Sequence, residues 1–534
     1  MDPVIVVGAG PVGLSLALAL AGSGVPSVVL DEGPGKDLPR PARTVVLHAD
    51  TAAMAQRLGC TTLRDEGAYY AAWRTVRRGR DTRRTAFGDG PAPAPLHVPQ
   101  HALARGLRDA AGTHPLVQLV TDSKLDSLEQ DDRGVTAHTR GAETTWWRGS
   151  YLVGCDGARS TVRKLLGIRF PGRTAVERHA VAALRTELPW PGEALLHRDP
   201  PRETTARPLA DGVWRLDWLL PGRGELVTPD ALVTLVRDSL AGWCGGSTPP
   251  YDLLDTGVHT LHHRLARRWR DGRAFLAGDA AHLLGALGTQ GVEEGLRDAE
   301  NLAWKLALAW HQGASEALLD SYEEERRTAV AARLRAADQS MPVLRGGGGL
   351  RTLLPGSARA GELLLTDGHL GRGPLGAEPS YAPPVAVREV PTDTDPGGPV
   401  ANVPVTAPDG STVPLRDLLG RGRLLVVLVA PGTGVWDRRH WLGAGLMPRL
   451  AAAVSALPVR TELLVADGYP GAPAHTVLLV RPDGHLAATF AGVRPAELYE
   501  AADSVRWGAP EGTRAPLDPS SKTPATPTHP AVID

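Results

Sequence analysis

The stretch VIVVGAGPVGLSLALALAGSGVPSVVLDE, residues Val4–Glu32, decides the fold. The apolar run Val4–Val7 predicts a β-strand, and the glycine-rich segment Gly8–Gly13 predicts a tight loop. A helix then continues to about Ala21, and a second apolar strand covers Ser27–Leu30. This order of strand, loop, helix and strand predicts a βαβ unit at the start of an α/β domain.

The glycine loop has the spacing that a dinucleotide pyrophosphate requires. Gly8, Gly10 and Gly13 fit G-x-G-x-x-G. The first permits the turn, the second lets the backbone approach a phosphate, and the third lets the helix pack close to the strand. Pro11 and Val12 open the helix, whose N-terminal N–H groups and dipole favour a phosphate.

An acidic residue follows the second strand, where dinucleotide-binding proteins hold a ribose. Asp31 lies 18 residues after Gly13, and its carboxylate can accept hydrogen bonds from ribose hydroxyls. Glu32 adjoins it and is the alternative, but the spacing favours Asp31. With the strand, loop and helix all present, the stretch predicts a dinucleotide site rather than a plain glycine-rich turn.

Length and composition limit the number of domains and the classes of function that the chain can have. The 534 residues exceed what one core usually supports, so two or three domains are expected. The formal charge of −1 argues against a dominant nucleic-acid surface. Three widely separated cysteines show neither disulfide nor zinc spacing, which fits a reducing, cytoplasmic compartment. Gly and Pro interrupt the apolar N-terminus and no basic leader precedes it, so neither a signal peptide nor a membrane span is predicted.

Two later segments repeat the pattern of an apolar strand that ends in an aspartate. YLVGCDGARSTVRKLLG (Tyr151–Gly167) ends its strand at Asp156, and GRAFLAGDAAHLL (Gly272–Leu284) ends its strand at Asp279. Either aspartate alone could simply cap a helix. Three strand-and-turn elements of this kind along one chain favour a shared ligand site.

Together these segments resemble the class A FAD-dependent aromatic hydroxylases of the para-hydroxybenzoate hydroxylase fold. DGARSTVR (Asp156–Arg163) matches the family's DGxxSxVR motif, GRAFLAGDAAH and GLRDAENLAWKLA match its GD motif and the helix that follows, and SYEEERR (Ser321–Arg327) resembles SYExER. The resemblance covers residues 1 to about 335 densely. It implies an α/β fold with a Rossmann-like FAD-binding domain, an inserted β-sheet substrate domain and, in the phenol-hydroxylase branch, a C-terminal thioredoxin-like domain.

The resemblance also implies roles for individual residues. Asp279 would contact the ribityl and pyrophosphate part of FAD, and the backbone of Gly291–Glu293 would lie by the pyrimidine edge of the flavin. Arg43 would lie near the FAD phosphates and is the one candidate for a catalytic role, although it could be a surface arginine. Gln100 would lie near the ribityl chain and Leu125 would offer a backbone contact to adenine. The full predicted set for FAD is Gly8, Gly10, Pro11, Val12, Gly13, Asp31, Glu32, Arg43, Gln100, Leu125, Asp156, Asp279, Gly291, Val292 and Glu293.

The loop before that last helix departs from the family pattern. Gly285-Ala286 replaces a Pro-Pro pair, which suggests a more adaptable loop or a differently shaped pocket. Glu293 replaces an Asn beside the flavin, and an ionised carboxylate near flavin N1 would disfavour the reduced flavin anion. The alternative is that Glu293 and Glu294 point outward and simply favour the helix start.

The rest of the chain divides by composition and resemblance. Short apolar strands after about Phe170 fit the substrate sheet, where Trp214, Trp218 and the His262-His263 pair could line a pocket or be ordinary core and surface. No HxxxH or acidic cluster indicates a metal. LVRPDG (Leu479–Gly484) resembles a signature of the thioredoxin-like domain, which lacks cysteine here and therefore CxxC chemistry. The predicted parts are 1–170 with 266–345 (FAD-binding), 171–265 (substrate sheet), 346–399 (linker), 400–510 (thioredoxin-like) and 515–534 (disordered tail).

The resemblance implies a monooxygenase. NADPH or NADH would reduce FAD, O₂ would form a flavin C4a-hydroperoxide, and one oxygen atom would pass to an aromatic ring. No second GxGxxG follows a strand, which suits a nicotinamide that binds transiently. The Ala/Arg/Gly/Pro-rich composition resembles that of proteins from high-GC actinomycetes. Together with the C-terminal domain, this resemblance implies a tailoring hydroxylase for an aromatic polyketide or similar natural product, in antibiotic biosynthesis. A homodimer is possible, and no membrane partner is expected.

Two alternatives remain open from the sequence. Baeyer–Villiger oxygen insertion uses the same flavin, and nothing in the sequence separates it from hydroxylation. A flavin-binding cyclase, dehydratase or scaffold that is not an oxygenase is the alternative from a different class. Glu293 and the missing Pro pair are its support.

Overall fold

The computed structural model describes residues 1–36, 38–77, 80–87, 94–141, 145–198, 203–221, 227–284, 291–313, 315–345, 371–382, 390–431 and 446–507, with short pieces at 363–364 and 366–368. The predicted tail at 515–534, half of the linker and the loop residues Gly285-Ala286 lie outside these residues. Within them, no helix is both long and apolar enough to cross a membrane.

A mostly parallel six-stranded sheet forms the centre of the molecule. Its spatial order is β18 (Arg270–Asp271), β19 (Ala274–Leu276), β12 (Tyr151–Gly154), β1 (Val4–Val7), β2 (Ser27–Leu30) and β8 (Val117–Val120). The strands that end in the three predicted motifs, β1, β12 and β19, are direct neighbours. Because parallel strands run in one direction, their loops emerge at the same edge of the sheet.

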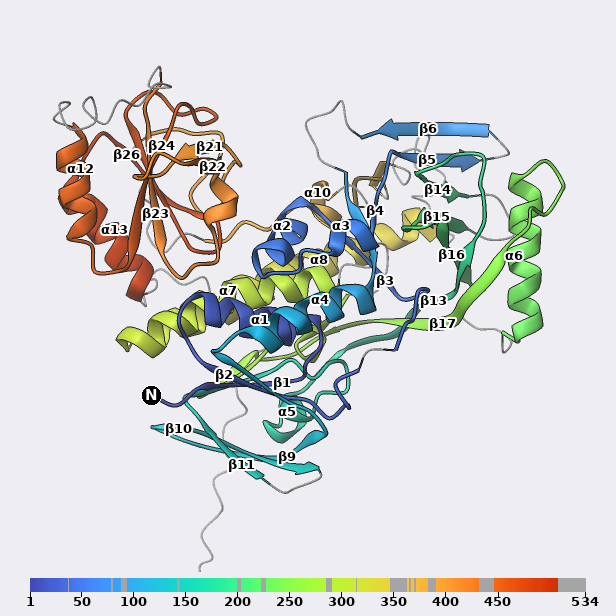
Figure 1. Cartoon of the computed structure of the whole chain (residues 1–534), viewed down its shortest axis with the longest axis horizontal. Helices are drawn as coiled ribbons and strands as arrows, with labels where there is room; N and C mark the ends of the chain where they lie inside the picture. Colours follow the sequence, from blue (N-terminus) through green and yellow to red (C-terminus); the bar gives the residue numbers. More distant parts are fainter. Residues whose placement is uncertain are drawn as a thin grey trace, which may run out of the picture.

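This sheet is covered on both faces, which explains its uninterrupted apolar strands. Helices α1 (Pro11–Gly22), α4 (Gln100–Thr113) and α7 (Gly291–Gln312) lie on one face, and the antiparallel sheet of β9 (Ser123–Asp131), β10 (Gly134–Gly141) and β11 (Thr145–Gly149) covers the other (Figure 1). Ile5 packs against Gly149, where a Cβ would lie 2.7 Å from the Ile5 side chain.

Smaller elements complete the FAD-binding part. Strands β3 (Thr44–Leu47), β7 (Leu96–Pro99) and β4 (Ala68–Tyr69) form a small sheet in that order. This part also contains α2 (Ala49–Arg57), α3 (Leu63–Glu66), α5 (Thr161–Leu165), the 3-10 turn η1 (Gly278–Ala280) and α8 (Glu316–Arg345). Helix α10 (Gly373–Gly376) falls in the predicted linker, and the 3-10 turn η3 (Leu415–Leu418) belongs to the C-terminal region.

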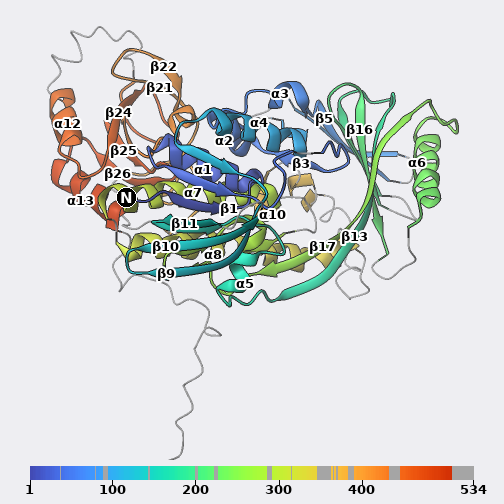
Figure 2. The ribbon, with the colours of Figure 1, turned by 60° about the horizontal axis from the view of Figure 1, so that its bottom comes forward.

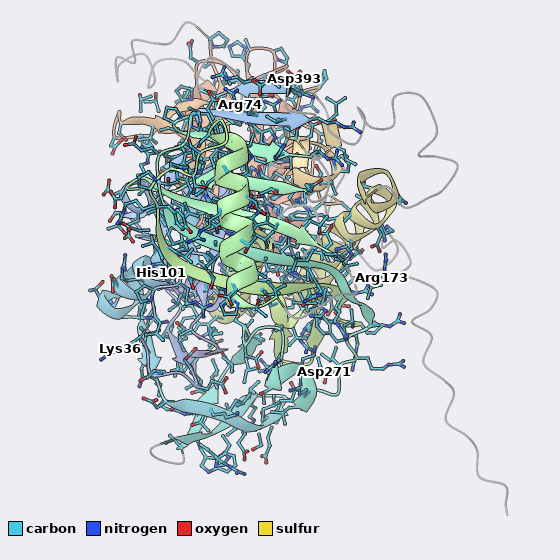
Figure 3. The ribbon with its side chains drawn as sticks, turned by 90° about the vertical axis from the view of Figure 1, so that its right-hand side faces the viewer. Lys36, Arg74, His101, Arg173, Asp271 and Asp393 are labelled. Atoms are coloured by element: carbon cyan, nitrogen blue, oxygen red, sulfur yellow. The ribbon has the colours of Figure 1, made fainter. Side chains whose placement is uncertain are left out.

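An eight-stranded sheet forms the second region. Its order is β20 (His282–Leu283), β17 (Asp252–Leu265), β13 (Gly172–Arg185), β16 (Val213–Leu220), β15 (Thr204–Pro208), β14 (Glu193–His197), β5 (Ala72–Arg77) and β6 (Arg80–Ala86). It therefore extends beyond the predicted range 171–265, because β5 and β6 come from the N-terminal part and β20 from the GD segment. Helix α6 (Pro229–Trp243) lies over its outer face, as Figure 3 shows.

Three of the residues that the sequence offered for a substrate pocket, Trp214, Trp218 and His263, are buried. Trp214 and Trp218 are buried in the core between the sheet and α6, and Trp218 Nε1 donates to Ser239 Oγ at 2.9 Å. His263 is buried and its Nδ1 lies 3.0 Å from Asp338 of α8. Trp214 and Trp218 thus support packing against α6, and His263 packs against α8.

The C-terminal region contains a third sheet. Its strands follow the order β22 (Thr412–Pro414), β21 (Pro404–Thr406), β24 (Thr461–Ala466), β23 (Leu424–Val429), β25 (Thr476–Val480) and β26 (Leu486–Ala491), with helices α12 (Leu446–Ser455) and α13 (Pro495–Trp507). Strands β23 and β24 are parallel, whereas β25 and β26 are antiparallel to their neighbours. This region and the eight-stranded sheet lie at opposite ends of the molecule (Figures 1 and 2).

Buried ion pairs join the C-terminal region to the FAD-binding part. Arg481 of the LVRPDG segment donates to Glu325 of SYEEERR at 2.7 and 2.8 Å. Asp483 accepts from Trp304 Nε1 at 3.1 Å. Tyr381 is also buried, and its hydroxyl accepts from Arg326 at 3.0 Å, so this described piece of the predicted linker is packed rather than free. The two motifs bind each other and hold the regions together.

Candidate FAD site

The three glycines of the first loop face different surroundings. Gly8 has φ +104°, and a Cβ there would lie 2.5 Å from the carbonyl oxygen of Cys155. A Cβ on Gly13 would lie 2.0 Å from the carbonyl oxygen of Gly8. A Cβ on Gly10 would meet no atom within 4 Å. Gly8 and Gly13 are therefore required by packing, whereas Gly10 leaves open space at the N-terminus of α1, where a phosphate could approach.

Asp31 holds this loop in place. Its carboxylate accepts from the backbone N–H of Ala9 at 2.6 Å and of Gly33 at 2.8 Å. Glu32 instead has a side chain that is 70% exposed and lies 3.4 Å from Lys124. Of the two acidic residues that the sequence offered, Asp31 faces the glycine loop and Glu32 points away from it.

Asp156 combines a capping role with an open acceptor. One oxygen, Oδ2, accepts from the backbone N–H groups of Thr161 and Val162 at 2.6 and 3.0 Å. Ser160 also caps α5, because its Oγ accepts from the backbone N–H of Arg163 at 2.9 Å. The other oxygen, Asp156 Oδ1, is buried and has no hydrogen-bond partner among the described residues. Such an orphaned acceptor fits a ligand that carries a donor.

Arg163 braces the second motif against the third. Its Nη1 donates to the carbonyl oxygen of Ala280 at 2.7 Å, and its guanidinium lies 3.9 Å from the centre of the Phe170 ring. The arginine of DGARSTVR is therefore a structural link between the strand ends.

The first and third motifs meet around Val12. A Cβ on Gly278 would lie 3.0 Å from Val12 Cγ2, and one on Gly295 would lie 2.4 Å from the same atom. Beside them, Asp279 Oδ1 lies 3.5 Å from where a Cβ on Gly291 would stand. The start of α1, the GD turn and the start of α7 thus enclose one site.

The acidic side chains at the GD turn differ in role. Asp279 is exposed, yet desolvation by the surrounding protein raises the pKa of its carboxyl, opposed by the positive charges of His282 and Arg43. Asp298 is fully buried and accepts from the backbone N–H of Gly278 at 2.9 Å, with His282 Nε2 at 2.7 Å. Sequence reasoning missed Asp298, although it stands in the quoted GLRDAEN segment. Asp298 thus fixes the GD turn, and the carboxylate of Asp279 is left available to bind a ligand.

Arg43, Gln100 and Leu125 lie at the periphery. Arg43 is exposed, and its carbonyl oxygen accepts from the backbone N–H of Gln100 at 2.8 Å, so these two are neighbours. Leu125 is 4% exposed and its side chain belongs to the apolar core. Only its backbone is left for the predicted contact. The start of β9 does lie beside Asp31, because Ser123 N–H donates to the Asp31 carbonyl oxygen at 2.8 Å.

The expectation that Glu293 and Glu294 point outward is wrong. Glu293 is 1% exposed and accepts from His48 N–H and Thr51 Oγ1, both at 2.7 Å, while its other oxygen lies 2.8 Å from His48 Nδ1. Burial opposes ionisation, but His48 outweighs it and lowers the pKa of Glu293 to about 2. Glu293 in turn raises the pKa of His48 against the effect of burial. The carboxylate is thus part of an ion pair that fastens α7 to the start of α2.

Glu294 is buried among arginines. Arg297 Nη1 lies 2.6 Å, Arg326 Nη2 2.7 Å and Arg333 Nη2 3.2 Å from its carboxylate oxygens. Burial opposes ionisation, but Arg333, Arg297 and Arg326 together hold the pKa of Glu294 well below its ordinary range. Neither glutamate is free to act on a flavin as an isolated negative charge.

These features fit FAD. The site offers the N-termini of two helices, open space at Gly10, an orphaned acceptor on Asp156 and an accessible carboxylate on Asp279. They define a dinucleotide-binding protein, whose cofactor site lies at the carboxyl ends of the strands of a parallel sheet. The chain belongs to the family described as FAD binding domain, whose pattern matches residues 1–337, and its cofactor is FAD.

Comparisons with known proteins agree with this family. The 3-(3-hydroxy-phenyl)propionate/3-hydroxycinnamic acid hydroxylase of Comamonas testosteroni is 34% identical over 340 residues, which are 61% of this chain and 55% of that enzyme. The match therefore spans about half of the relative's length. The OxyS anhydrotetracycline hydroxylase of Streptomyces rimosus is 28% identical with a TM-score of 0.69, covering 95% of this chain and 99% of that one. The Diels-Alderase PyrE3 of pyrroindomycin biosynthesis is 26% identical with a TM-score of 0.65, covering 96% and 100%.

Proposed function

We propose that this protein is an FAD-dependent monooxygenase that uses NAD(P)H and O₂ to hydroxylate an aromatic, polyketide-like molecule. The observation that carries the proposal is the meeting of β1, β12 and β19 at one sheet edge, with the α7 N-terminus beside Asp279. The named hydroxylases among its relatives and structural neighbours support the same activity. Bound FAD, once reduced, supplies the electrons that activate O₂ for insertion of one oxygen atom, the other leaving as water.

The protein's own residues bind and orient. The backbone at Gly10 and the start of α1 hold the pyrophosphate, and Asp31 accepts from the ribose. Asp279 accepts from the ribityl chain, with Arg43 close enough to oppose the rise in its pKa. The N–H groups at Gly291 and Val292 favour negative charge on the pyrimidine edge of the flavin. Glu293 does not oppose that charge, because His48 neutralises it.

The C-terminal region is proposed to be a thioredoxin-like domain with a structural role. The spatial order β24-β23-β25-β26, with β23 and β24 parallel and helices α12 and α13, supports this assignment. The region contains no cysteine, and its proposed contribution is the contact with the FAD-binding part, through the ion pair of Arg481 with Glu325 and the hydrogen bond from Trp304 to Asp483.

The decisive experiment follows the spectrum of the bound flavin. The FAD-loaded protein is titrated with NADPH and with NADH in the absence of oxygen, alone and with a panel of polycyclic phenols and quinones. We expect the flavin to bleach, and at least one aromatic compound to accelerate bleaching. FAD that remains oxidised with both nucleotides across the whole panel contradicts the monooxygenase proposal.

A matched pair of glycine variants tests the FAD site itself. Gly10→Val places its side chain in open space, so we expect a folded protein that retains little FAD because the pyrophosphate position is blocked. Gly13→Val drives a side chain into the Gly8 carbonyl oxygen, so we expect loss of the fold. Normal FAD content in Gly10→Val, measured by absorbance after gel filtration, contradicts the assignment.

A second function is favoured by one specific observation. The protein resembles PyrE3 along nearly its whole length, and that structure is described as a Diels-Alderase. In a cyclase of this kind FAD would shape the site and NAD(P)H would not be consumed. Product formation from a polyene substrate without nucleotide or O₂ would favour this function, whereas substrate-dependent NAD(P)H oxidation would exclude it as the main activity.

A further inference from the structure

The inner face of the eight-stranded sheet carries a group of charged side chains. We call Glu177, His179, Arg207, Arg215 and Asp217 the sheet cluster. Side chains alternate along β13 and β16, so that Ala180, Leu216 and Trp218 face α6 while the cluster faces the other way. That other side meets the FAD-binding part, because Arg215 Nε donates to the carbonyl oxygen of Ala42 at 2.9 Å.

Four members of the sheet cluster satisfy one another. Asp217 Oδ1 lies 2.6 Å from His179 Nδ1, and Asp217 Oδ2 lies 2.9 Å from Arg215 Nη2. His179 Nε2 lies 3.3 Å from Glu177. Burial opposes protonation of His179, but Asp217 and Glu177 outweigh it and raise its pKa to about 9. Two cations therefore face two carboxylates.

Arg207 is the exception. Its side chain is nearly buried, with 4% of the residue exposed, and its Nε and Nη1 atoms have no hydrogen-bond partner among the described residues. It stands directly opposite Arg215 across β15 and β16, and its positive charge contributes to lowering the pKa of Arg215, after the larger effect of burial. A buried cation without an acceptor is costly, and a structure usually retains one only where an acceptor binds.

Uncharged hydrogen-bond donors also lie near Arg207. The Tyr70 hydroxyl and Thr205 Oγ1 are also buried and have no hydrogen-bond partner among the described residues. Burial raises the pKa of Tyr70 to about 12, so its hydroxyl stays protonated although Arg207 and Arg215 oppose this rise. His97, which Arg207 also influences, has its pKa lowered well below its ordinary value by burial and stays neutral. The group therefore offers unused N–H and O–H donors, and its three cations, His179, Arg207 and Arg215, outnumber its two carboxylates by one.

We propose that Arg207, with the Tyr70 hydroxyl as second donor, binds an anionic oxygen group of the substrate, either a carboxylate or an ionised enol. This inference rests on the proposed function, because it places the substrate on the inner face of the sheet. The position suits that role. Arg215 is anchored on Ala42, and the next residue, Arg43, lies near enough to Asp279 to influence it. One short segment thus connects the anion site to the FAD site.

The experiment compares each anion with its uncharged primary amide. FAD-loaded protein, kept oxidised and without nucleotide, is titrated with 3-(3-hydroxyphenyl)propionate and benzoate and with the corresponding amides. Binding is measured by calorimetry and by the absorption of the bound flavin. The proteins are wild type, Arg207→Gln, Arg207→Lys and Tyr70→Phe. Arg185→Gln serves as the control, since Arg185 lies on the same sheet with a 53% exposed side chain.

We expect wild type and Arg185→Gln to prefer the carboxylate of at least one pair by about tenfold or more, as a charge-assisted hydrogen bond would give. Arg207→Gln should lose that preference, Arg207→Lys should retain part of it, and Tyr70→Phe should weaken it. The proposal is overturned if wild type shows no preference in either pair, including no binding at all, or if Arg207→Gln keeps the full preference. Because no nucleotide is present, failure of flavin reduction in the earlier experiment would leave this result unaffected.

Discussion

Two buried clusters of charged side chains differ in whether every hydrogen-bond donor has an acceptor within the part of the chain that the structure describes. The α7 cluster, consisting of Glu294, Arg297, Asp298, Arg326 and Arg333, is closed upon itself: Arg326 is 0% exposed and donates to Asp298, Glu294 and Tyr381. The sheet cluster is equally buried but leaves two guanidinium nitrogens of Arg207 without a partner among the described residues. A cluster whose donors and acceptors are all paired holds helices and strands together. A cluster with unpaired donors is suited to bind a ligand.

The difference separates residues that maintain the fold from residues that bind. Arginine at both places carries the same charge and is similarly buried, so neither residue type nor burial distinguishes them. The hydrogen-bond inventory does, because each unsatisfied buried donor raises the free energy of the ligand-free state. Replacing Arg326 should therefore lower the stability of the ligand-free protein, whereas replacing Arg207 should leave it unchanged or raise it.

The largest effect is expected at Arg326. Arg326→Met leaves Glu294 and Asp298 with one fewer buried cation, and removing one partner of a buried pair costs about 3–5 kcal/mol. We expect a clear fall in the urea midpoint of the transition that releases FAD. Arg335→Met is the control, since Arg335 is an exposed residue of the same helix α8. An Arg326→Met protein as stable as the control would show that the closed cluster does not hold the fold.

Much of the architecture could be predicted because it depends on neighbours in sequence. The strands Val4–Val7 and Ser27–Leu30 agree with the expected spans, and α1 ends at Gly22, one residue beyond the predicted Ala21. The stretch PDALVTLVRDSLAGW, a helical pattern between the short strands of the substrate sheet, forms α6 (Pro229–Trp243) over its whole length. In each case the hydrophobic period and the flanking turn residues lie within a single segment.

The candidate site could be predicted only in part, because its decisive contacts join distant segments. The partner of Glu293 is His48, 245 residues away, and a helix-terminal glutamate is usually exposed, so burial reversed the expectation. The addition of β5 to the substrate sheet depends on pairing with β14, about which the local pattern says nothing. Arg207 is one of many arginines in the sequence, and only its missing partner marks it.

The second largest effect is expected in how the stability contributed by His179 depends on pH. In the folded protein His179 has a pKa of about 9, above its ordinary 6.5, so its contribution is fully present below pH 6.5 and is lost as pH rises to about 9. The loss is up to about 3 kcal/mol. His48 and Lys305 also have shifted pKa values, so the measured quantity is the difference between wild type and His179→Gln. We expect that difference to shrink steadily between pH 6.5 and pH 9, as thermal unfolding at each pH would show. Parallel curves would mean that Asp217 and Glu177 do not hold His179 protonated.

The smallest effect, and the sharpest contrast, is expected between the paired neighbours Arg207 and Arg215. Arg215→Met should lower the thermal midpoint, because Asp217 Oδ2 and the Ala42 carbonyl oxygen lose the donors that Arg215 supplies. Arg207→Met removes a cation that the ligand-free protein does not satisfy, so we expect the midpoint to be unchanged or raised, by about 1 kcal/mol in stability. If instead Arg207→Met is destabilised as much as Arg215→Met, Arg207 belongs to the fold and the two clusters are alike. If Arg207→Met gains stability while the preference for the carboxylate disappears, Arg207 is a residue that lowers the stability of the ligand-free protein and is needed for binding. That trade-off is expected of a binding residue and not of a structural one.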